Sequence, residues 1–153
     1  MPRTIATNTR TDLAGLLDFV RPRHDMIITT RRRDGSLQSS PVTAGVNPDG
    51  RIVIASYPER AKVANIRRDP RVSVVVLSDS FNGPWVQVET TGTVIDLPDA
   101  VEPLVEYFRC ISGEHSNWDE YRRAMVDQGK CLIDLEPVSW GPIATGGFPA
   151  RLA

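Results

Sequence analysis

The sequence predicts a mainly β fold, a small antiparallel barrel of six strands with helical insertions. Six segments carry a strand pattern, and most of them are joined by short turns, which fits an antiparallel barrel better than βαβ units. At 153 residues the chain has the length of one ordinary domain and can bury a core without disulfides. We therefore expect a single domain over residues 1–153.

The N-terminal part begins with a polar segment, residues 1–10, which we expect to form a loose arm. The segment TDLAGLLDFV that follows spaces its apolar residues at helical intervals, and Thr11 or Asp12 can cap the helix. A hairpin is expected next, with strands DMIITTRR and LQSSPVTAGV joined by an Asp-Gly turn. Pro41 inside the second strand indicates an edge strand or a bulge.

The middle of the chain continues with a turn at Asn47-Pro48-Asp49-Gly50 and a third strand, RIVIASY. The segment ERAKVANIRR then predicts a short helix that ends at Asp69-Pro70. Two further strands are expected, RVSVVVLSD and WVQVETTGTVID. In the second of these, Gln87 and Glu89 alternate with apolar residues, so one side should face water, a ligand or a partner.

The last part of the chain predicts two helices and one strand. The first helix opens near Leu97-Pro98-Asp99, and the second starts at a capping Ser116-Asn117 and ends near Gly129. The segment KCLIDL is the sixth expected strand. The Pro- and Gly-rich residues 137–153 are expected to form an irregular tail.

Composition excludes several classes of protein. The net charge of −1 gives no general attraction to nucleic acid. The two cysteines lack a metal-ligand spacing and indicate reduced thiols in a cytoplasmic protein, and no metal is expected. Apolar runs are too short for a membrane span. The sequence also contains no catalytic triad order and no Gly-rich dinucleotide or phosphate loop that would assign a catalytic residue.

Two cations stand at the start of the helix after RIVIASY. A helix N-terminus offers unpaired backbone N–H groups and the positive end of a dipole, so Arg60 and Lys62 there predict an anion site. The alternative is that both are solvated surface cations. Lys62 is one of only two lysines in the chain, the other being Lys130.

Three segments carry a resemblance to a known family. PERAKVANIRRDPRVSVVV and RRRDGSLQSSPV resemble the pyridoxamine-phosphate-oxidase-like split-barrel superfamily. EYFRCISGEHSNWDEYRRAMVDQGKCLIDLEPVSWG is similar to the actinobacterial deazaflavin-dependent reductases of the B type. The resemblance implies an FMN-binding split-barrel fold and a cytoplasmic homodimer with two coenzyme clefts at the subunit interface. The coenzyme implied is F420, an 8-hydroxy-5-deazaflavin, and FMN is the alternative.

The resemblance also implies roles for individual residues. Arg60 and Lys62 would bind the coenzyme phosphate, with Ser56 and Ala61 beside them. Gln38, Ser40, Pro41 and Val42 would lie along the ring. Trp85 and Gln87 would reach the coenzyme from the neighbouring subunit, although Trp85 can equally be an interface or core aromatic residue.

The function implied is an F420-dependent oxidoreductase that transfers a hydride to an unsaturated or quinone-like small molecule. An FMN-dependent oxidoreductase, a coenzyme carrier and a haem-binding barrel with His24 or His115 as ligand are the alternatives, and a nucleic-acid-binding barrel is disfavoured by charge. A proton could come from Tyr57, Ser40 or water. Arg31–Arg33 are either solvated or bind the polyglutamate tail of F420.

Overall fold

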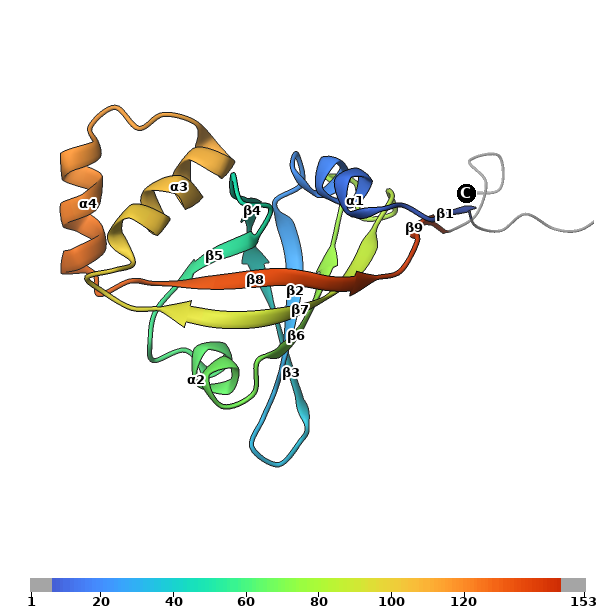
Figure 1. The fold of residues 1–153 in the computed structure, drawn as a ribbon, viewed down its shortest axis with the longest axis horizontal. Helices are drawn as coiled ribbons and strands as arrows, with labels where there is room; N and C mark the ends of the chain where they lie inside the picture. Colours follow the sequence, from blue (N-terminus) through green and yellow to red (C-terminus); the bar gives the residue numbers. More distant parts are fainter. Residues whose placement is uncertain (1–6, 147–153) are drawn as a thin grey trace, which may run out of the picture.

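A computed structural model describes residues 7–146, and its body is a seven-stranded antiparallel sheet with helices packed against it (Figure 1). The strands lie in the order β3-β2-β6-β7-β8-β5-β4. Their bounds are β2 (Asp25–Arg31), β3 (Leu37–Thr43), β4 (Gly45–Val46), β5 (Ile52–Ser56), β6 (Arg71–Val76), β7 (Val86–Ile95) and β8 (Cys131–Trp140).

The expected mainly β, antiparallel fold is confirmed, but the expected count of six strands was wrong. The segment 37–46, expected as one strand, forms β3 and β4 on either side of Ala44. These two strands lie at opposite edges of the sheet although one residue separates them, so the sheet curls into a half-barrel until its edges meet at Ala44. The Ala44 N–H donates to the His24 carbonyl at 2.9 Å, which fixes the crossing point.

Pro41 lies on an edge strand, as its sequence predicts. The Arg32 N–H donates to the Ser36 carbonyl at 2.8 Å, and hydrogen-bonded pairs alternate along an antiparallel ladder. The register then places the Ile27–Pro41 pair at a position without ladder bonds. The missing N–H of Pro41 faces away from β2 and removes no ladder bond.

All four expected helices form, namely α1 (Leu13–Val20), α2 (Ala61–Arg68), α3 (Val101–Ser112) and α4 (Trp118–Asp127). Their caps are largely those that the sequence predicts. The Asp12 carboxylate accepts a bond from the Gly15 N–H at 2.9 Å at the start of α1. The Asn117 side chain accepts one from the Glu120 N–H at 3.1 Å at the start of α4.

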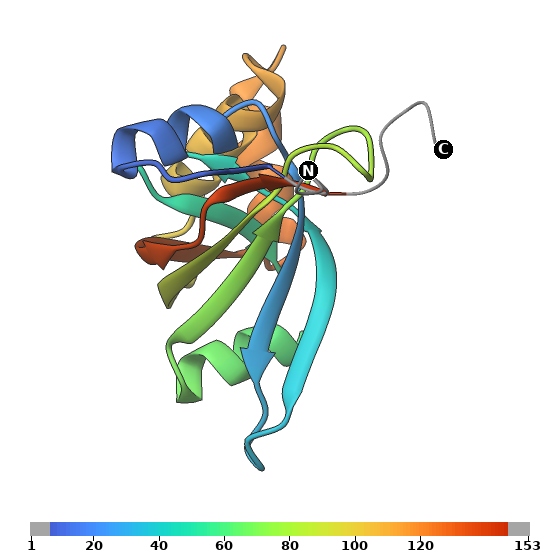
Figure 2. The same cartoon turned by 90° about the vertical axis from the view of Figure 1, so that its right-hand side faces the viewer.

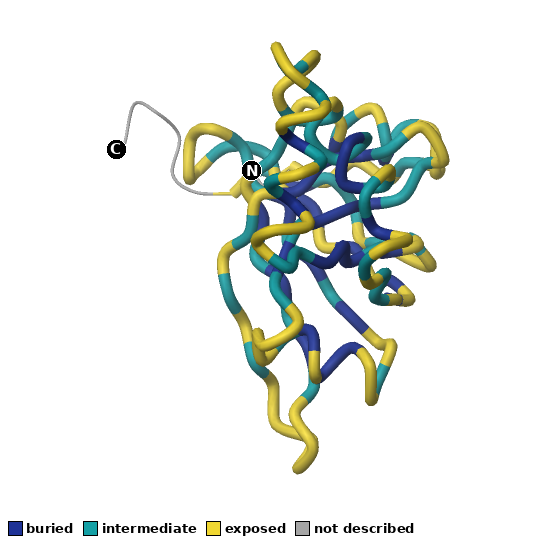
Figure 3. The backbone as a smooth tube through the Cα atoms, turned by 90° about the vertical axis from the view of Figure 1, so that its left-hand side faces the viewer, coloured by how far each residue is buried: buried dark blue, intermediate teal, exposed yellow. Residues whose placement is uncertain are grey.

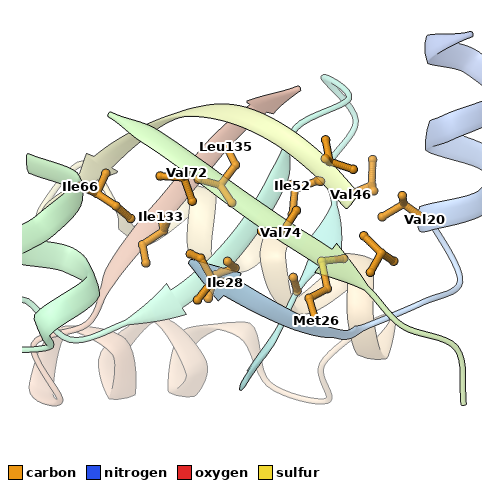
Figure 4. Close-up of a cluster of buried hydrophobic side chains, with 14 of the residues drawn as sticks. Val20, Met26, Ile28, Val46, Ile52, Ile66, Val72, Val74, Ile133 and Leu135 are labelled. Atoms are coloured by element: carbon orange, nitrogen blue, oxygen red, sulfur yellow. The ribbon is translucent and has the colours of Figure 1, made fainter. Parts of the chain in front are cut away.

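The larger core fills the inside of the curled sheet, where alternate strand side chains meet α1 and α2 (Figure 4). Gly92 of β7 faces this core where α2 lies against β7. A Cβ atom there would stand 3.0 Å from a Val72 methyl carbon, 3.1 Å from one of Leu135 and 3.2 Å from one of Ile66. The close approach of α2 to β7 therefore requires a residue without a side chain at position 92.

A second core lies outside the barrel, between the β5–β8 pair and α3 with α4. Ile52 and Ile54 of β5 point into the barrel, whereas Val53 points outward and packs with Leu104 and Tyr121. The Tyr121 hydroxyl donates to the Leu104 carbonyl at 2.7 Å, which joins α4 to α3. This packing holds α3 against the barrel.

The two ends of the described chain pair with each other, which corrects the expected loose arm and irregular tail. β1 (Thr7–Thr9) pairs with β9 (Ile143–Thr145) in a two-stranded sheet, and β8 continues as far as Trp140. The ladder between β7 and β8 shifts register beside Pro137, so this proline is accommodated at an irregularity. The remaining parts of the arm and tail, 1–6 and 147–153, lie outside the described residues.

Candidate functional site

A cavity of about 440 Å³ lies between the edge strand β3, the end of β5 and the first turn of α2. We call it the β3–α2 cavity. It lies where the two edges of the sheet approach each other, and α3 contributes to its wall. Its lining residues are Ser40, Pro41, Val42, Thr43, Ile54, Ala55, Ser56, Tyr57, Arg60, Lys62, Tyr107 and Lys130.

The structure brings together most of the residues that the sequence marked as a coenzyme site. Those that line the β3–α2 cavity are Ser40, Pro41, Val42, Ser56, Arg60 and Lys62. Ala61 is the first residue of α2 and lies between the two cations. Gln38 lies two residues before Ser40 on β3 but does not line the cavity, and its Oε1 accepts a 3.3 Å bond from the Thr30 hydroxyl.

Three cations line this cavity without a counter-ion. Within residues 7–146, neither Arg60, Lys62 nor Lys130 has a carboxylate within 4.0 Å, and no acidic residue lines the cavity. Burial lowers the pKa of Lys62, and the positive charge of Arg60 lowers it further. The Lys130 ammonium lies 4.0 Å from the centroid of the Tyr57 ring. This arrangement suits a bound anion.

The backbone at the start of α2 adds to the positive character of the cavity. Arg60 is the N-cap and makes no capping bond with its side chain, because a guanidinium has no acceptor. The first-turn N–H groups of Ala61 and Lys62 therefore have no side-chain cap. They lie at the positive end of the helix dipole, where an anion is favoured.

Two hydroxyl groups on the cavity wall differ in their bonding. The Ser40 Oγ is buried and has no hydrogen-bond partner among the described residues. A buried hydroxyl without a partner costs about 1–3 kcal/mol, so a polar ligand atom there would be stabilising. The Tyr107 hydroxyl instead donates to the Thr43 carbonyl at 3.0 Å and ties α3 to β3. Burial raises the pKa of Tyr107, so this donor keeps its proton at neutral pH.

Trp85 and Gln87 lie in a second cavity, of about 400 Å³, which shares no lining residue with the first. Glu89 and Trp140 also line this second cavity, so the described residues give it a carboxylate and no cation. Within one chain, Trp85 and Gln87 are therefore not brought to the cations of α2. Their expected role at the coenzyme would need a second copy of the chain.

The three consecutive arginines Arg31–Arg33, the arginine run, do not line the β3–α2 cavity. The β2–β3 hairpin extends beyond the rest of the sheet (Figure 2), and its tip is exposed (Figure 3). The Arg32 guanidinium donates to the Leu37 carbonyl at 2.8 Å, which uses that side chain within the hairpin. The Arg31 carbonyl accepts a 2.8 Å bond from Arg68 of α2.

Neither histidine lines either of these two cavities. The His24 Nδ1 lies 2.8 Å from the Ala44 carbonyl oxygen and must donate to it. The His115 Nδ1 accepts a 2.8 Å bond from the Asn117 N–H, and its ring packs against Phe108 and Tyr121. Both imidazoles have structural contacts of this kind, so they are poorly placed as ligands of a haem in the β3–α2 cavity.

Sequence reasoning missed Lys130 and Tyr107 as members of this site. The strand pairing explains the first, because Ser56 pairs with Cys131 and the next residues outward are Tyr57 and Lys130. The packing of α3 on the barrel brings Tyr107 to the cavity. The sequence did offer one signal for Lys130, because lysine is rare in this chain. Its two lysines, Lys62 and Lys130, line the same cavity.

Comparisons with known proteins agree with this fold. Residues 15–143 match the family described as pyridoxamine 5'-phosphate oxidase. A conserved hypothetical protein of Mycobacterium tuberculosis has a similar structure, with a TM-score of 0.71 at 19% identity over 99% of this chain and 100% of that chain.

Two further solved structures resemble the chain. An F420 reductase gives a TM-score of 0.59 at 15% identity over 80% of this chain and 93% of its own. A putative pyridoxamine 5'-phosphate oxidase of Listeria innocua gives a TM-score of 0.61 at 17% identity, over 85% of this chain and 96% of its own. At these identities the likeness is one of fold. Within residues 7–146, no helix has the length and apolar character needed to cross a membrane.

Proposed function

This chain belongs to the pyridoxamine 5'-phosphate oxidase family, and from that premise we propose that it is an F420-dependent oxidoreductase. The coenzyme would bind in the β3–α2 cavity, and the substrate would be an unsaturated or quinone-like small molecule. The observation that carries the proposal is the group of unpaired cations at the uncapped start of α2. The fold likeness to an F420 reductase supports the choice of coenzyme.

The residues of the cavity fit a phosphate-bearing coenzyme. Arg60 and Lys62 supply charge-assisted donors, and the first-turn N–H groups of α2 supply further donors to the same anion. The Ser40 hydroxyl can bond a polar atom of the ring system. Val42 lies on the same side of β3 as Ser40 and offers an apolar contact to the ring.

When bound, a reduced deazaflavin supplies the hydride, so the chain has to position the reactants and exclude water. The Tyr107–Thr43 bond holds α3 against β3 and closes one side of the cavity. Tyr57 and Ser40 stand on the cavity wall as proton sources for the reduced product, besides water. Where the bound coenzyme excludes water, the positively charged wall would also strengthen the contacts made to the phosphate.

The proposal includes a homodimer. Trp85 is 39% exposed and lies with Gln87 outside the β3–α2 cavity. In a dimer, both could approach the coenzyme held by the other chain. The notable exposure of an indole on an otherwise polar strand face supports an interface there.

Titration of the purified protein with F420 and, separately, with FMN tests the coenzyme. Coenzyme fluorescence reports binding, and we expect micromolar or tighter affinity for F420 and weaker binding of FMN. Tighter binding of FMN would identify an FMN-dependent oxidoreductase in the same cavity. Binding of neither coenzyme would refute the proposed function.

A further inference from the structure

Lys130 has no part in the function proposed above, although it lines the same cavity. It comes from the junction between α4 and β8, whereas Arg60 and Lys62 come from the start of α2. Its ammonium lies 4.0 Å from the Tyr57 ring centroid, and in the described part of the chain no carboxylate pairs with it. Lys130 is therefore a second, separately anchored source of positive charge.

The charges in the cavity exceed what one phosphate requires. Arg60, Lys62 and the N-terminus of α2 together already match the charge of a phosphate ester. Lys130 adds a third full positive charge to a cavity of about 440 Å³, and no acidic side chain of residues 7–146 lines this cavity. Like charges in such a space repel one another, and a ligand with only one anionic group would leave part of this repulsion in place.

The position of Lys130 indicates where a second anionic group would lie. The Lys130 ammonium lies 4.0 Å and the Arg60 guanidinium 6.0 Å from the centroid of the same ring, that of Tyr57, so both sources of charge lie beside this ring. A small ligand beside the Tyr57 ring can therefore contact both sources of charge. One ammonium matches one monovalent anion, which is the charge of a carboxylate.

We propose that Lys130 binds a carboxylate of the ligand whose phosphate lies at Arg60 and Lys62, and so selects phosphorylated ligands that carry a carboxylate. This inference rests on the proposed function, which places the phosphate at α2. It assigns the second anionic group to Lys130 and not to the arginine run, which lies outside the cavity.

Two small probes that differ by one carboxylate test this assignment. 2-Phosphoglycerate carries a phosphate and a carboxylate, and glycerol 2-phosphate has a hydroxymethyl group in place of the carboxylate. Both are titrated into the ¹⁵N-labelled protein, and the amide resonances of α2 report binding. We expect the wild type to bind 2-phosphoglycerate about fivefold more tightly, the upper end of what one solvent-exposed ion pair contributes.

The variants separate the two cations. Lys130→Gln should abolish the preference for 2-phosphoglycerate, because it should weaken the binding of glycerol 2-phosphate much less than that of 2-phosphoglycerate. Lys130→Arg, which keeps the charge and the bulk beside Tyr57, should retain the preference. Arg123→Gln removes one exposed charge from α4 and serves as the matched control. It should keep the preference for 2-phosphoglycerate over glycerol 2-phosphate. Lys62→Gln should weaken both probes equally.

The outcomes distinguish this inference from the proposed function. No preference in the wild type, or an equal loss for both probes in Lys130→Gln, would overturn the role of Lys130 while the phosphate site stands. Unchanged binding of both probes in Lys62→Gln, or no shift of α2 resonances with either probe, would overturn the phosphate site and the inference together.

Discussion

At the scale of single residues, the two ends of α2 differ in how their cations are balanced. Arg67, in its last turn, forms an ion pair with Asp96 at 2.7 Å. Arg60 and Lys62, at the first turn, have no such partner among the described residues. Arg67 is thus neutralised by a carboxylate, whereas Arg60 and Lys62 carry available charge and line the β3–α2 cavity.

The lowered pKa of Lys62 predicts a pH dependence of anion binding. Burial and Arg60 favour the neutral amine, so Lys62 loses its proton below the ordinary lysine value of 10.5. An anion binds the ammonium form, and affinity should therefore fall as the pH rises through this lowered pKa. Titrations with F420 between about pH 7.5 and 10.5 measure the decline. In Lys62→Arg the guanidinium stays charged, and a decline of the same size there would assign the effect to another group.

The unpartnered Ser40 hydroxyl predicts a separation of stability from binding. Ser40→Ala removes a buried hydroxyl that has no hydrogen-bond partner among the described residues, so the free energy of unfolding in urea should stay the same or rise. Coenzyme affinity should fall by about 0.5–1.5 kcal/mol, the net value of one hydrogen bond. A clear loss of stability with unchanged affinity would show that the hydroxyl serves the fold and not the ligand.

At the scale of elements, local chemistry predicted starts, ends and types well. Asp12 and Asn117 cap α1 and α4 as expected because a capping bond spans only three residues. The division of one expected strand at Ala44 was not predictable, since it depends on the two edges of the sheet meeting in space. The pairing of β1 with β9 was missed for the same reason.

The same limit applies to the candidate site. Arg60 and Lys62 were predictable because the helix start and both cations belong to one short segment. Lys130 reaches the cavity through the pairing of β5 with β8, and Tyr107 reaches it through the packing of α3. Contacts between distant segments follow from the curled sheet, which no local pattern encodes.

The contact between α2 and β7 predicts a stability effect at Gly92. Gly92→Ala would place a methyl group within 3.0–3.2 Å of three core side chains, and such overpacking typically costs about 1–3 kcal/mol. Urea unfolding followed by circular dichroism measures this loss. Gly141→Ala is the matched control, because its Cβ would meet no atom within 4 Å, and its stability should stay close to wild type. Equal stability of the two variants would mean that α2 can move away from β7 at little cost.

At the scale of the whole molecule, charge is distributed so that one cavity is cationic although the chain is nearly neutral. The net charge is −1, yet among residues 7–146 three cations and no acidic residue line the β3–α2 cavity, while Glu89 lines the second cavity, that of Trp85 and Gln87. The curl of the sheet produces this separation, because it brings β3 and β5 together at one place and leaves the start of β7 elsewhere.

The proposed dimer predicts complementation between two defective chains. Trp85→Ala and Lys62→Gln should each weaken F420 binding, although they lie in different cavities. If the two residues act on one coenzyme from two subunits, a mixed dimer regains one intact site. Unfolding and refolding the two variants together should therefore restore a fraction of tight sites in a fluorescence titration. If mixed dimers form and no tight F420 sites are recovered, the site lies within one chain.

The central claim, that the β3–α2 cavity holds the coenzyme phosphate, is tested most directly by calorimetric titration of F420 into the wild type and into Arg60→Gln/Lys62→Gln. Arg21→Gln/Arg123→Gln, which removes two exposed charges outside this cavity, is the control. We expect the first double variant to lose about 2 kcal/mol of binding free energy or more, roughly thirtyfold in affinity. The control should bind as the wild type does. Equal affinity of all three proteins would contradict the claim.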